Sequence, residues 1–360
     1  MRAFAILVVL FFLAETAGRA SCGNPITYGS LEGAFHEVSI NDSCVSLDAV
    51  AFSLTTSVMD EAPIFSAQKT TGGECVWSIG TIVKDRISPI VQIHDDLWAV
   101  APTAGPDDTY WLVVGGRYIN TSRSATPTYL RAFNKGFTPT SIGSTANGQL
   151  YAIEQSPSKS DEKGLRLVSI ANGTSVAIPF AGWTENLLRG SDGNLYFRLF
   201  EKWHCHIFEI DGSGTLFDKA TCPWENGRAI AVDIQGAIWQ PGLLSIVQYD
   251  PSGHITKSIG PIAPVPCTIT NTAALEPRLI TADQRGAVWF VYGQKLWRVD
   301  DRGNLSAINL PSGRLIADAM VETSDGTLWL TTTDWNHGGA FYRFVPAMLR
   351  GELAADVLDH

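Results

Sequence analysis

Charged side chains recur at one fixed distance before a repeated aromatic residue. Eleven residues before the last five of six such aromatics, the chain has Thr140, Glu185, Arg228, Arg278 and Asp318. Apolar runs typical of buried strands follow directly. Arginine binds carboxylates and phosphates through paired hydrogen bonds. One interpretation is therefore a polar ring that binds an anionic or sugar-like ligand. The alternative is that the two arginines and the two acids neutralise one another in salt bridges.

A second set of reactive side chains lies in a short loop near the end of the repeats. Asp334, Trp335 and His337 combine a carboxylate, an aromatic platform and an imidazole beside two glycines. These residue types suit ligand binding or acid–base chemistry. A solvated turn is the alternative. We assign Asp334 and Trp335 to ligand binding, and His337 is the one candidate catalytic residue. The sequence contains no G-x-S-x-G, H-E-x-x-H or P-loop motif.

The His204-Cys205-His206 segment permits two interpretations. Alternation along a strand puts both imidazoles on one face, where they could bind a metal ion. No third ligand is evident nearby, so no metal site is assigned. The hairpin turn at residues 211–214 brings Cys205 close to Cys222. A cross-strand disulfide between these two cysteines is the preferred interpretation.

The elements that must position these residues are set by an internal repeat. Each copy has a turn residue, usually Gly, followed by a short apolar run with Trp or Tyr. The aromatic residues are spaced by 53, 45, 43, 50 and 40 positions. Periods of this length with one Gly turn and one aromatic per copy are typical of a β-propeller. The copies are residues 94–98, 147–151, 192–196, 235–239, 285–289 and 325–329.

Each copy continues into an alternating strand and an Asp/Gly turn, which predicts a hairpin. The chain is therefore expected to be an all-β propeller of four-stranded antiparallel blades, with seven blades preferred and six the alternative. The propeller spans residues 21–346, and residues 26–90 form a degenerate first blade. The last copy lacks an outer strand, so we expect an N-terminal strand to complete it and close the ring. Residues 347–360 form a C-terminal tail.

The first twenty residues have the pattern of a secretory signal peptide. Arg2 precedes an apolar run, and small residues at Gly18 and Ala20 mark the cleavage site. The run is too short to span a bilayer, and no later segment is apolar enough to do so. We expect export to the periplasm or the extracellular space. An even count of six cysteines fits disulfides in an exported chain.

The net charge of −10 argues against nucleic acid as a partner, because nucleic acid requires a basic surface. We expect a monomer.

The segments at residues 192–214 and 285–303 resemble the blades of streptogramin-lyase-like propellers, and more distantly those of NHL-type and gluconolactonase-type propellers. The resemblance covers residues 88–346. It implies a propeller scaffold, and for the lyases it implies a W-F-T-E strand and His and Glu residues with a magnesium ion. Three residues after the aromatic this chain has Glu154, Leu199, Gly242, Tyr292 and Thr332. Only Glu154 matches.

The preferred function is an exported, non-catalytic propeller that binds a small polar or anionic ligand, or a protein, at the mouth of its channel. No cofactor is assigned. The alternative is a lyase or lactonase-type enzyme that uses Mg²⁺ or Ca²⁺ held by acids of the same ring. Glu185, Asn186 and Asp318 have the side-chain types that a gluconolactonase-like metal site requires.

Overall fold

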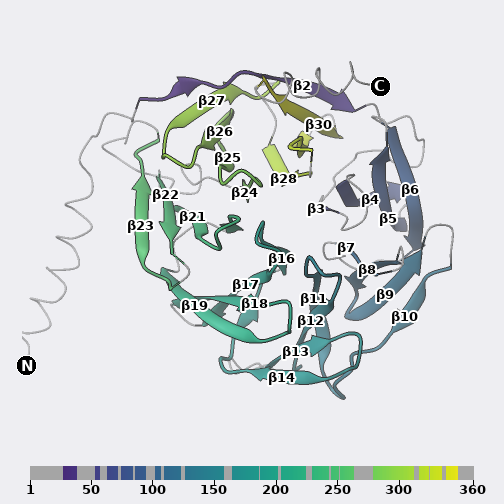
Figure 1. The fold of residues 1–360 in the computed structure, drawn as a ribbon. Coiled ribbons are helices and arrows are strands. Elements are labelled where there is room, and N and C mark those ends of the chain that lie inside the picture. The colour runs from purple at the N-terminus through teal and green to yellow at the C-terminus, as the bar shows by residue number, and fades with distance from the viewer. Residues whose placement is uncertain are drawn as a thin grey trace, which may run out of the picture.

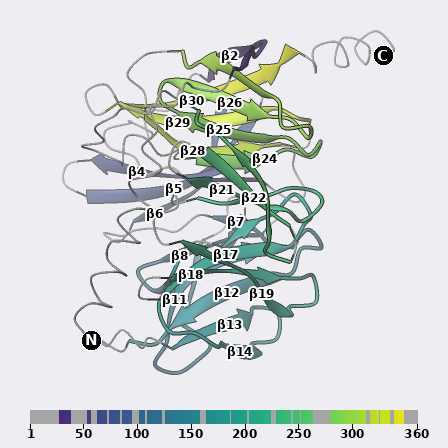
Figure 2. The ribbon, with the colours of Figure 1, turned by 90° about the vertical axis from the view of Figure 1, so that its left-hand side faces the viewer.

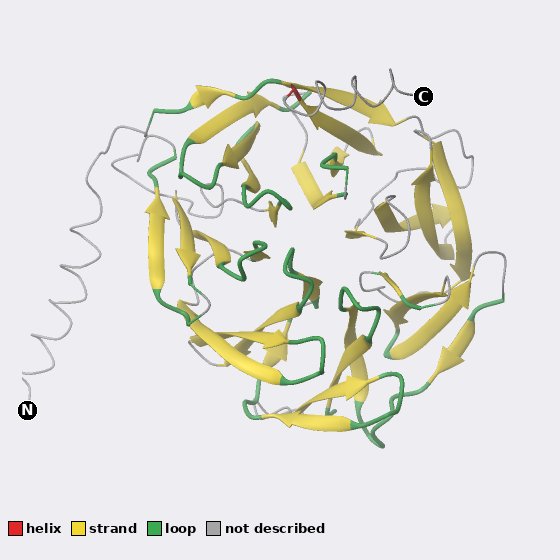
Figure 3. Cartoon of the chain, in the orientation of Figure 1, coloured by secondary structure: helices red, strands yellow, loops and turns green. Residues whose placement is uncertain are grey.

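The computed structural model describes residues 27–38, 53–56, 63–71, 74–83, 86–94, 102–106, 109–122, 126–157, 164–185, 187–201, 204–223, 229–242, 245–250, 252–262, 279–311, 316–323, 325–334 and 338–347. Between residues 53 and 94, and at residues 316–318 and 332–340, it describes the backbone only. Apart from one helical residue, Ala347, every element of the described residues is a β-strand (Figure 3). Within the same residues, no helix is long and apolar enough to cross a membrane.

The described strands form seven sheets arranged in a ring, with the first strands of each sheet nearest the centre (Figure 1). Within each sheet the strands that follow one another in the chain are antiparallel neighbours, except in one sheet whose first two strands both pair with the third. The predicted fold class, an all-β propeller of four-stranded antiparallel blades, is confirmed. Figure 2 shows the same ring from its side.

Each blade runs from an inner strand near the centre of the ring to an outer strand on the rim. The first three complete blades in the chain contain β3 (Ser53–Thr56), β4 (Pro63–Thr71), β5 (Glu74–Val83) and β6 (Arg86–His94); β7 (Thr103–Ala104), β8 (Thr109–Val114), β9 (Arg117–Ser122) and β10 (Thr128–Leu130); and β11 (Thr138–Ser144), β12 (Leu150–Gln155), β13 (Leu165–Ser169) and β14 (Ser175–Ile178). The next two contain β15 (Trp183–Thr184), β16 (Leu188–Arg189), β17 (Leu195–Glu201), β18 (His204–Ile210) and β19 (Leu216–Pro223); and β20 (Ala231–Val232), β21 (Ile238–Gly242), β22 (Ser245–Tyr249) and β23 (Ile255–Ile259). The last two contain β24 (Leu279–Ala282), β25 (Val288–Tyr292), β26 (Lys295–Val299) and β27 (Leu305–Asn309); and β28 (Ile316–Glu322), β29 (Leu328–Asp334) and β30 (Gly338–Pro346).

The N-terminal segment completes the ring. Strand β2 (Gly33–Val38) pairs antiparallel with β30 and becomes the outer strand of the last blade (Figure 1). The ring of Phe35 packs on Phe344 at a centroid distance of 4.7 Å. Strand β1 (Gly29–Ser30), just before it, pairs parallel with β27 of the neighbouring blade as a fifth strand. The predicted closure by an N-terminal strand is therefore present. Of the segment predicted as a first blade, β3–β6 form their own sheet, whereas β1 and β2 join other sheets.

The hydrophobic core lies between neighbouring blades rather than at the centre of the ring. One cluster joins the β11–β14 and β15–β19 blades through residues such as Ile153, Leu187 and Phe197. Another joins the β20–β23 and β24–β27 blades through Trp239, Phe290 and Trp297. Among the blades whose side chains are described, neighbouring blades thus bury their faces against each other, which explains why the aromatic residue of the repeat recurs in these copies.

The turn between the first two strands of each blade explains the glycine of the repeat. Gly236 and Gly286 have φ angles of 77° and 81°, a region that L-residues with a Cβ rarely adopt. Because strands alternate in direction, this turn and the outer Asp/Gly turn lie at one end of the ring, the turn face. The opposite end, the loop face, holds the loops between second and third strands and the connections between blades.

The structure corrects one copy of the repeat. The copy at residues 94–98 was predicted to supply the aromatic of its blade, but residues 95–98 lie outside the described part of the chain and His94 ends the outer strand β6. In the next blade Trp111 pairs with Thr103 as Trp289 pairs with Thr281. Trp111 therefore occupies the aromatic position there, and it precedes Tyr151 by one ordinary repeat length.

Candidate functional site

The predicted charged column coincides with a defect in the inner strands. The register of β11 shifts at Thr140, and the register of β28 shifts at Asp318. In the blade that follows β11–β14, Glu185 lies in the interruption between β15 and β16. A β-bulge releases one residue from the ladder and redirects its side chain, so charged residues are tolerated at this position. Arg228 and Arg278 lie outside the described residues.

Glu185 forms an ion pair within its own blade. Arg198, on the neighbouring strand β17, donates from Nε to Oε2 at 2.9 Å and from Nη2 to Oε1 at 2.7 Å. The side chain of Arg198 is 1% exposed and that of Glu185 is 26% exposed. Burial lowers the pKa of Arg198, and the charge of Glu185 acts in the opposite direction. The carboxylate at the loop face is thus held by a buried guanidinium.

An aromatic stack lies beside this ion pair. Trp183 faces Phe200 with ring centroids 4.1 Å apart and an interplanar angle of 12°. The guanidinium of Arg198 lies over the same Phe200 ring at 5.1 Å. The side chain of Phe200 is buried, whereas Trp183 is 46% exposed. Indole, carboxylate and guanidinium therefore meet at the start of one inner strand, a set we call the mouth cluster: Trp183, Glu185, Arg198 and Phe200.

The disulfide lies in the same row of the blade as the mouth cluster, on its two outer strands. Trp183 pairs with Phe200, Phe200 with Cys205, and Cys205 with Cys222, so the four residues form one row across the blade. Cys205 and Cys222 are joined by a disulfide with a Cα–Cα distance of 4.9 Å. Both cysteines are buried. The covalent bond ties the two outer strands together at the level of the aromatic stack.

Of several other predicted site residues, the structure describes only the backbone or does not describe the residue. Asp334 ends strand β29 at the loop face, and Asp318 lies in β28, with only the backbone described at both positions. Trp335, His337 and Asn186 lie outside the described residues. His206 stacks on Phe180 at 4.1 Å, and its Nδ1 lies 3.2 Å from Oδ2 of Asp218. Within the described part of the chain, no three His, Cys, Asp or Glu residues are grouped to hold a metal ion.

Glu154, the one match to the lyase pattern, has a structural role. Its side chain is fully buried, and Oε1 accepts hydrogen bonds from the Tyr118 hydroxyl at 2.9 Å and from the backbone of Phe133 at 2.6 Å. Oε2 accepts from the backbone and the side chain of Asn134. The carboxylate therefore holds the connection between two blades. Burial of the Tyr118 hydroxyl, together with the nearby charge of Glu154, raises the pKa of Tyr118.

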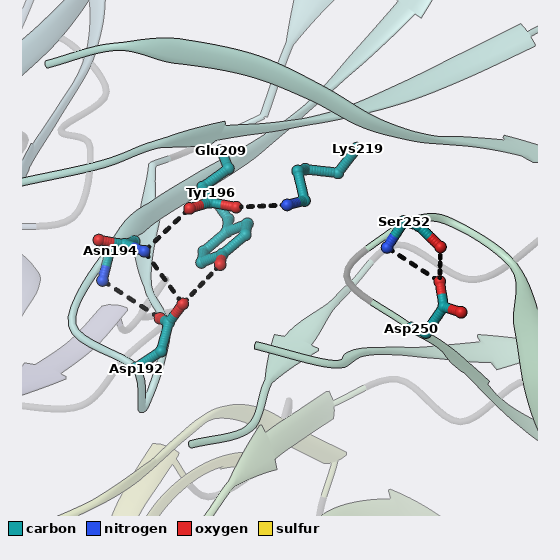
Figure 4. A network of polar contacts seen from close by, with 7 residues as sticks. All are labelled: Asp192, Asn194, Tyr196, Glu209, Lys219, Asp250 and Ser252. Carbon is teal, nitrogen blue, oxygen red and sulfur yellow. Dashed lines mark hydrogen bonds and ion pairs between the residues drawn. The ribbon is translucent and has the colours of Figure 1, made fainter. Parts of the chain in front are cut away.

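The turn face carries a second set of polar contacts, which serve the turns themselves. In Figure 4 the Tyr196 hydroxyl donates to Asp192 at 2.6 Å, and Asn194 bridges Asp192 and Glu209. Lys219 pairs with Glu209 at 3.0 Å. Burial raises the pKa of Asp192. Trp239 and Trp289 are held by equivalent hydrogen bonds in their own blades. The network around Tyr196 is therefore one form of a contact that the repeat makes in several blades.

One carboxylate at the turn face stands apart from that pattern. Glu322 ends the inner strand β28, and its Oε2 accepts a hydrogen bond from the backbone N–H of Gln284 in the preceding blade at 3.0 Å. Burial, with a contribution from the nearby Asp283, raises the pKa of Glu322 to about 8. At the same end Ser191 donates to the carbonyl oxygen of Ala282, two blades away, at 3.1 Å. The inner turns thus approach one another closely at the turn face.

Sequence reasoning missed Arg198, Trp183 and Glu322. A signal for Arg198 was available: two positions after the aromatic, the other copies have the uncharged residues Ile153, Pro241, Val291 and Thr331. An arginine inside such a strand requires a partner. Trp183 and Glu322 had no comparable signal, because exposed aromatics and acids are common at strand ends.

The ring of blades, with its N-terminal closing strand, defines the class of the protein as a β-propeller. Several solved structures are similar to it in fold. A streptogramin B lyase structure matches with a TM-score of 0.61 and 16% identity over 87% of this chain and 98% of that one. Virginiamycin B lyase from Staphylococcus aureus matches with a TM-score of 0.60 and 16% identity over 87% and 100%.

The structure described as YCF48 bound to D1 peptide matches with a TM-score of 0.60 and 12% identity over 89% of this chain and 99% of that one. The predicted structural resemblance to streptogramin-lyase-like propellers is therefore confirmed, at identities that indicate a shared fold. No protein-family model matches the chain. No curated protein matches it in sequence.

Proposed function

We propose that this propeller is a non-catalytic binding protein whose ligand, a small polar molecule or a protein segment, is bound at the loop face beside the mouth cluster. The observation that carries the proposal is the buried Arg198 that holds Glu185 next to an exposed Trp183. Polar groups of fixed orientation beside an aromatic surface are typical of ligand sites.

The scaffold itself does not require this ion pair. Four other blades have Ile153, Pro241, Val291 or Thr331 at the position of Arg198. A buried ion pair gains little stability over apolar residues of similar size, because both charges lose their hydration. A charge that the fold does not need, placed beside an exposed aromatic, supports a role in recognition.

The alternative function is a metal-dependent lyase or lactonase-like enzyme. Two structures similar in fold are named as lyases, whereas YCF48 is named as bound to a peptide. Glu154 is the only residue that matches the lyase strand, and four hydrogen-bond donors already engage its carboxylate. This favours binding over catalysis. An enzyme of this type would use Glu185 and Asp318 for the metal and His337 as acid or base.

Export is part of the proposal. The buried disulfide between Cys205 and Cys222 suits an oxidising compartment. Expression of the full chain in a secreting host, followed by mass determination of the released protein, should give a chain that begins at Ser21. A mature protein that retains residues 1–20 would contradict export by cleavage.

The binding function is tested by thermal-shift screening against sugar acids, neutral sugars and short peptides, followed by titration of each hit. Trp183→Ala and Arg198→Met should each raise the dissociation constant of a true hit by about tenfold or more. Arg166→Met is the matched control, because Arg166 also lies over an aromatic ring, Phe137, in the preceding blade. Equal effects of Arg198→Met and Arg166→Met would place the ligand elsewhere.

Metal analysis separates the two functions. Purified protein that retains stoichiometric Mg²⁺ or Ca²⁺, or that either ion stabilises strongly, would favour the enzyme. The binding protein should show no stabilisation by millimolar Mg²⁺ or Ca²⁺.

A further inference from the structure

The outer edges of the blades differ in how they are protected. An edge strand presents unpaired backbone groups, and proteins usually protect it with charges, a bulge or a covering segment. Strand β27 is covered by β1. Strand β19 has a bulge and the charged pair Asp218 and Lys219, and strand β23 has a bulge and Lys257.

Strand β14 has none of these protections within the described residues. It contains Ser175, Val176, Ala177 and Ile178, its pairing with β13 has no bulge, and no described strand pairs with its outer edge. It lies on the outer rim of the ring (Figure 1). Val176 is 56% exposed and Ala177 is exposed. In the repeat Val176 corresponds to Ile308 of β27, because each lies opposite the equivalent leucine of its third strand.

The covered edge shows what such a strand accepts. On β27, Gly29 and Ser30 pair with Ser306 and Ala307, and the backbone N–H of Leu31 donates to the Ala307 carbonyl at 3.0 Å. Leu31 is buried, and Ile308 is packed into the same cluster. A fifth, extended strand is therefore compatible with the outer edge of a complete blade in this fold.

The described residues of the loop that lies beside β14 are basic, although the chain is acidic overall. Phe133, 41% exposed, lies against Gly173 at the turn before β14, and Ser175 donates to the side chain of Asn134 at 3.1 Å. The same connecting loop carries the exposed Arg131 and Lys135. Among the described residues from 102 to 182, the charged ones are Arg117, Arg131, Lys135, Arg166 and the fully buried Glu154.

We propose that the outer edge of β14 is a docking surface for an extended, acidic segment of a partner protein, which adds to the blade as a further strand. Backbone pairing would supply the affinity, Val176 and Phe133 would accept an aliphatic side chain, and Arg131 and Lys135 would select acidic residues. The surface lies on the rim of the ring, and its occupation is independent of the proposed ligand at the channel mouth.

The test uses the full chain and two labelled peptides, (Val-Glu)4 and (Val-Lys)4, in fluorescence anisotropy at low and high salt. The acidic peptide should bind about tenfold more tightly than the basic one, and the difference should shrink at high salt. Val176→Asp and Lys135→Glu should each weaken that binding by about tenfold. Ile255→Asp is the matched control, because Ile255 is exposed on the bulged edge β23.

Four outcomes would overturn the proposal. Equal binding of the two peptides would show that the surface does not select acidic residues. If Ile255→Asp weakened binding as much as Val176→Asp, the binding site would not be the edge of β14. A dimer of the chain that the acidic peptide does not dissociate, but that Val176→Asp does, would assign the edge to a second copy. Tighter binding of a twelve-nucleotide single strand than of the acidic peptide would assign the basic surface to nucleic acid.

Discussion

The indole Nε1 of Trp239 donates a hydrogen bond to Oδ2 of Asp233 at 2.9 Å. The other carboxylate oxygen, Oδ1, accepts from the backbone of Gln235 and Ala237. One buried aspartate thus ties the aromatic residue of the repeat to the turn that precedes it. The same contact joins Trp289 to Asp283 at 3.1 Å. In other blades a Thr, or an Asp two positions later, replaces the aspartate.

Asp233→Ala should destabilise the protein by about 3 kcal/mol, because it leaves the buried N–H of Ala237, the part-buried N–H of Gln235 and the indole N–H of Trp239 without their acceptor. Urea unfolding followed by tryptophan fluorescence measures the change. Asp233→Asn, which retains one acceptor, should cost less. Asp250→Ala is the matched control, since Asp250 makes the same kind of turn contacts at the surface. An equal loss for Asp233→Ala and Asp250→Ala would show that burial of the contact is unimportant.

Glu322 should make the stability of the protein depend on pH. Its pKa is about 8 in the folded protein, raised by burial and by Asp283, with Asp325 acting in the same direction and Arg285 opposing it. The folded state therefore binds the proton more tightly than the unfolded state. Stability supplied by this group is complete below the ordinary carboxyl pKa and is lost as the pH rises through about 8.

The measurement is the urea midpoint from pH 5 to pH 9. Glu322→Gln should flatten the decline and should be the more stable protein at pH 9. Glu37→Gln, at an exposed position on β2, is the control and should leave the decline unchanged. A wild-type profile that rises over this range would contradict the prediction.

The fold could be predicted because the repeat reflects backbone geometry. Gly236 and Gly286 recur because a turn with positive φ is needed in each blade, and Trp239 and Trp289 recur because each blade buries an aromatic against its neighbour. Trp111 was missed because the sequence has Asp108, and not a glycine, three residues before this aromatic.

The site was harder to predict for a physical reason. Glu185 could be predicted because these positions of the inner strands recur at a fixed distance, eleven residues, before the repeated aromatic residue. Its partner Arg198 follows it by thirteen residues and reaches it across an antiparallel pair, so no local motif joins them. The disulfide partner of Cys205 could be named, because strand pairing across a short hairpin puts Cys222 directly opposite.

Gly253 is a position where two blades approach too closely for a side chain. A Cβ there would overlap the carbonyl oxygen of Lys219 in the preceding blade, and the φ angle is 87°. Gly253→Ala should therefore cost about 2 kcal/mol or more, from backbone strain and from the clash. Gly148→Ala isolates the strain alone, because its φ is 80° and no atom lies within 4 Å of a Cβ there. Equal melting temperatures for the two variants would show that the approach of the blades relaxes without cost.

Phe35 should determine whether the ring remains closed. Strand β2 pairs with β30 along its whole length, and Phe35 anchors it on Phe344, which is fully buried. Phe35→Ala should destabilise the protein by about 2 kcal/mol. Because β2 is the strand that pairs the N-terminal segment with the last blade, hydrogen exchange should rise most in β30 and β29, before global unfolding. Tyr28→Ala is the matched control: Tyr28 packs on Trp297 of the neighbouring blade, so its loss should expose β27 instead. Faster exchange spread evenly over all blades in Phe35→Ala would contradict a closure that depends on this strand.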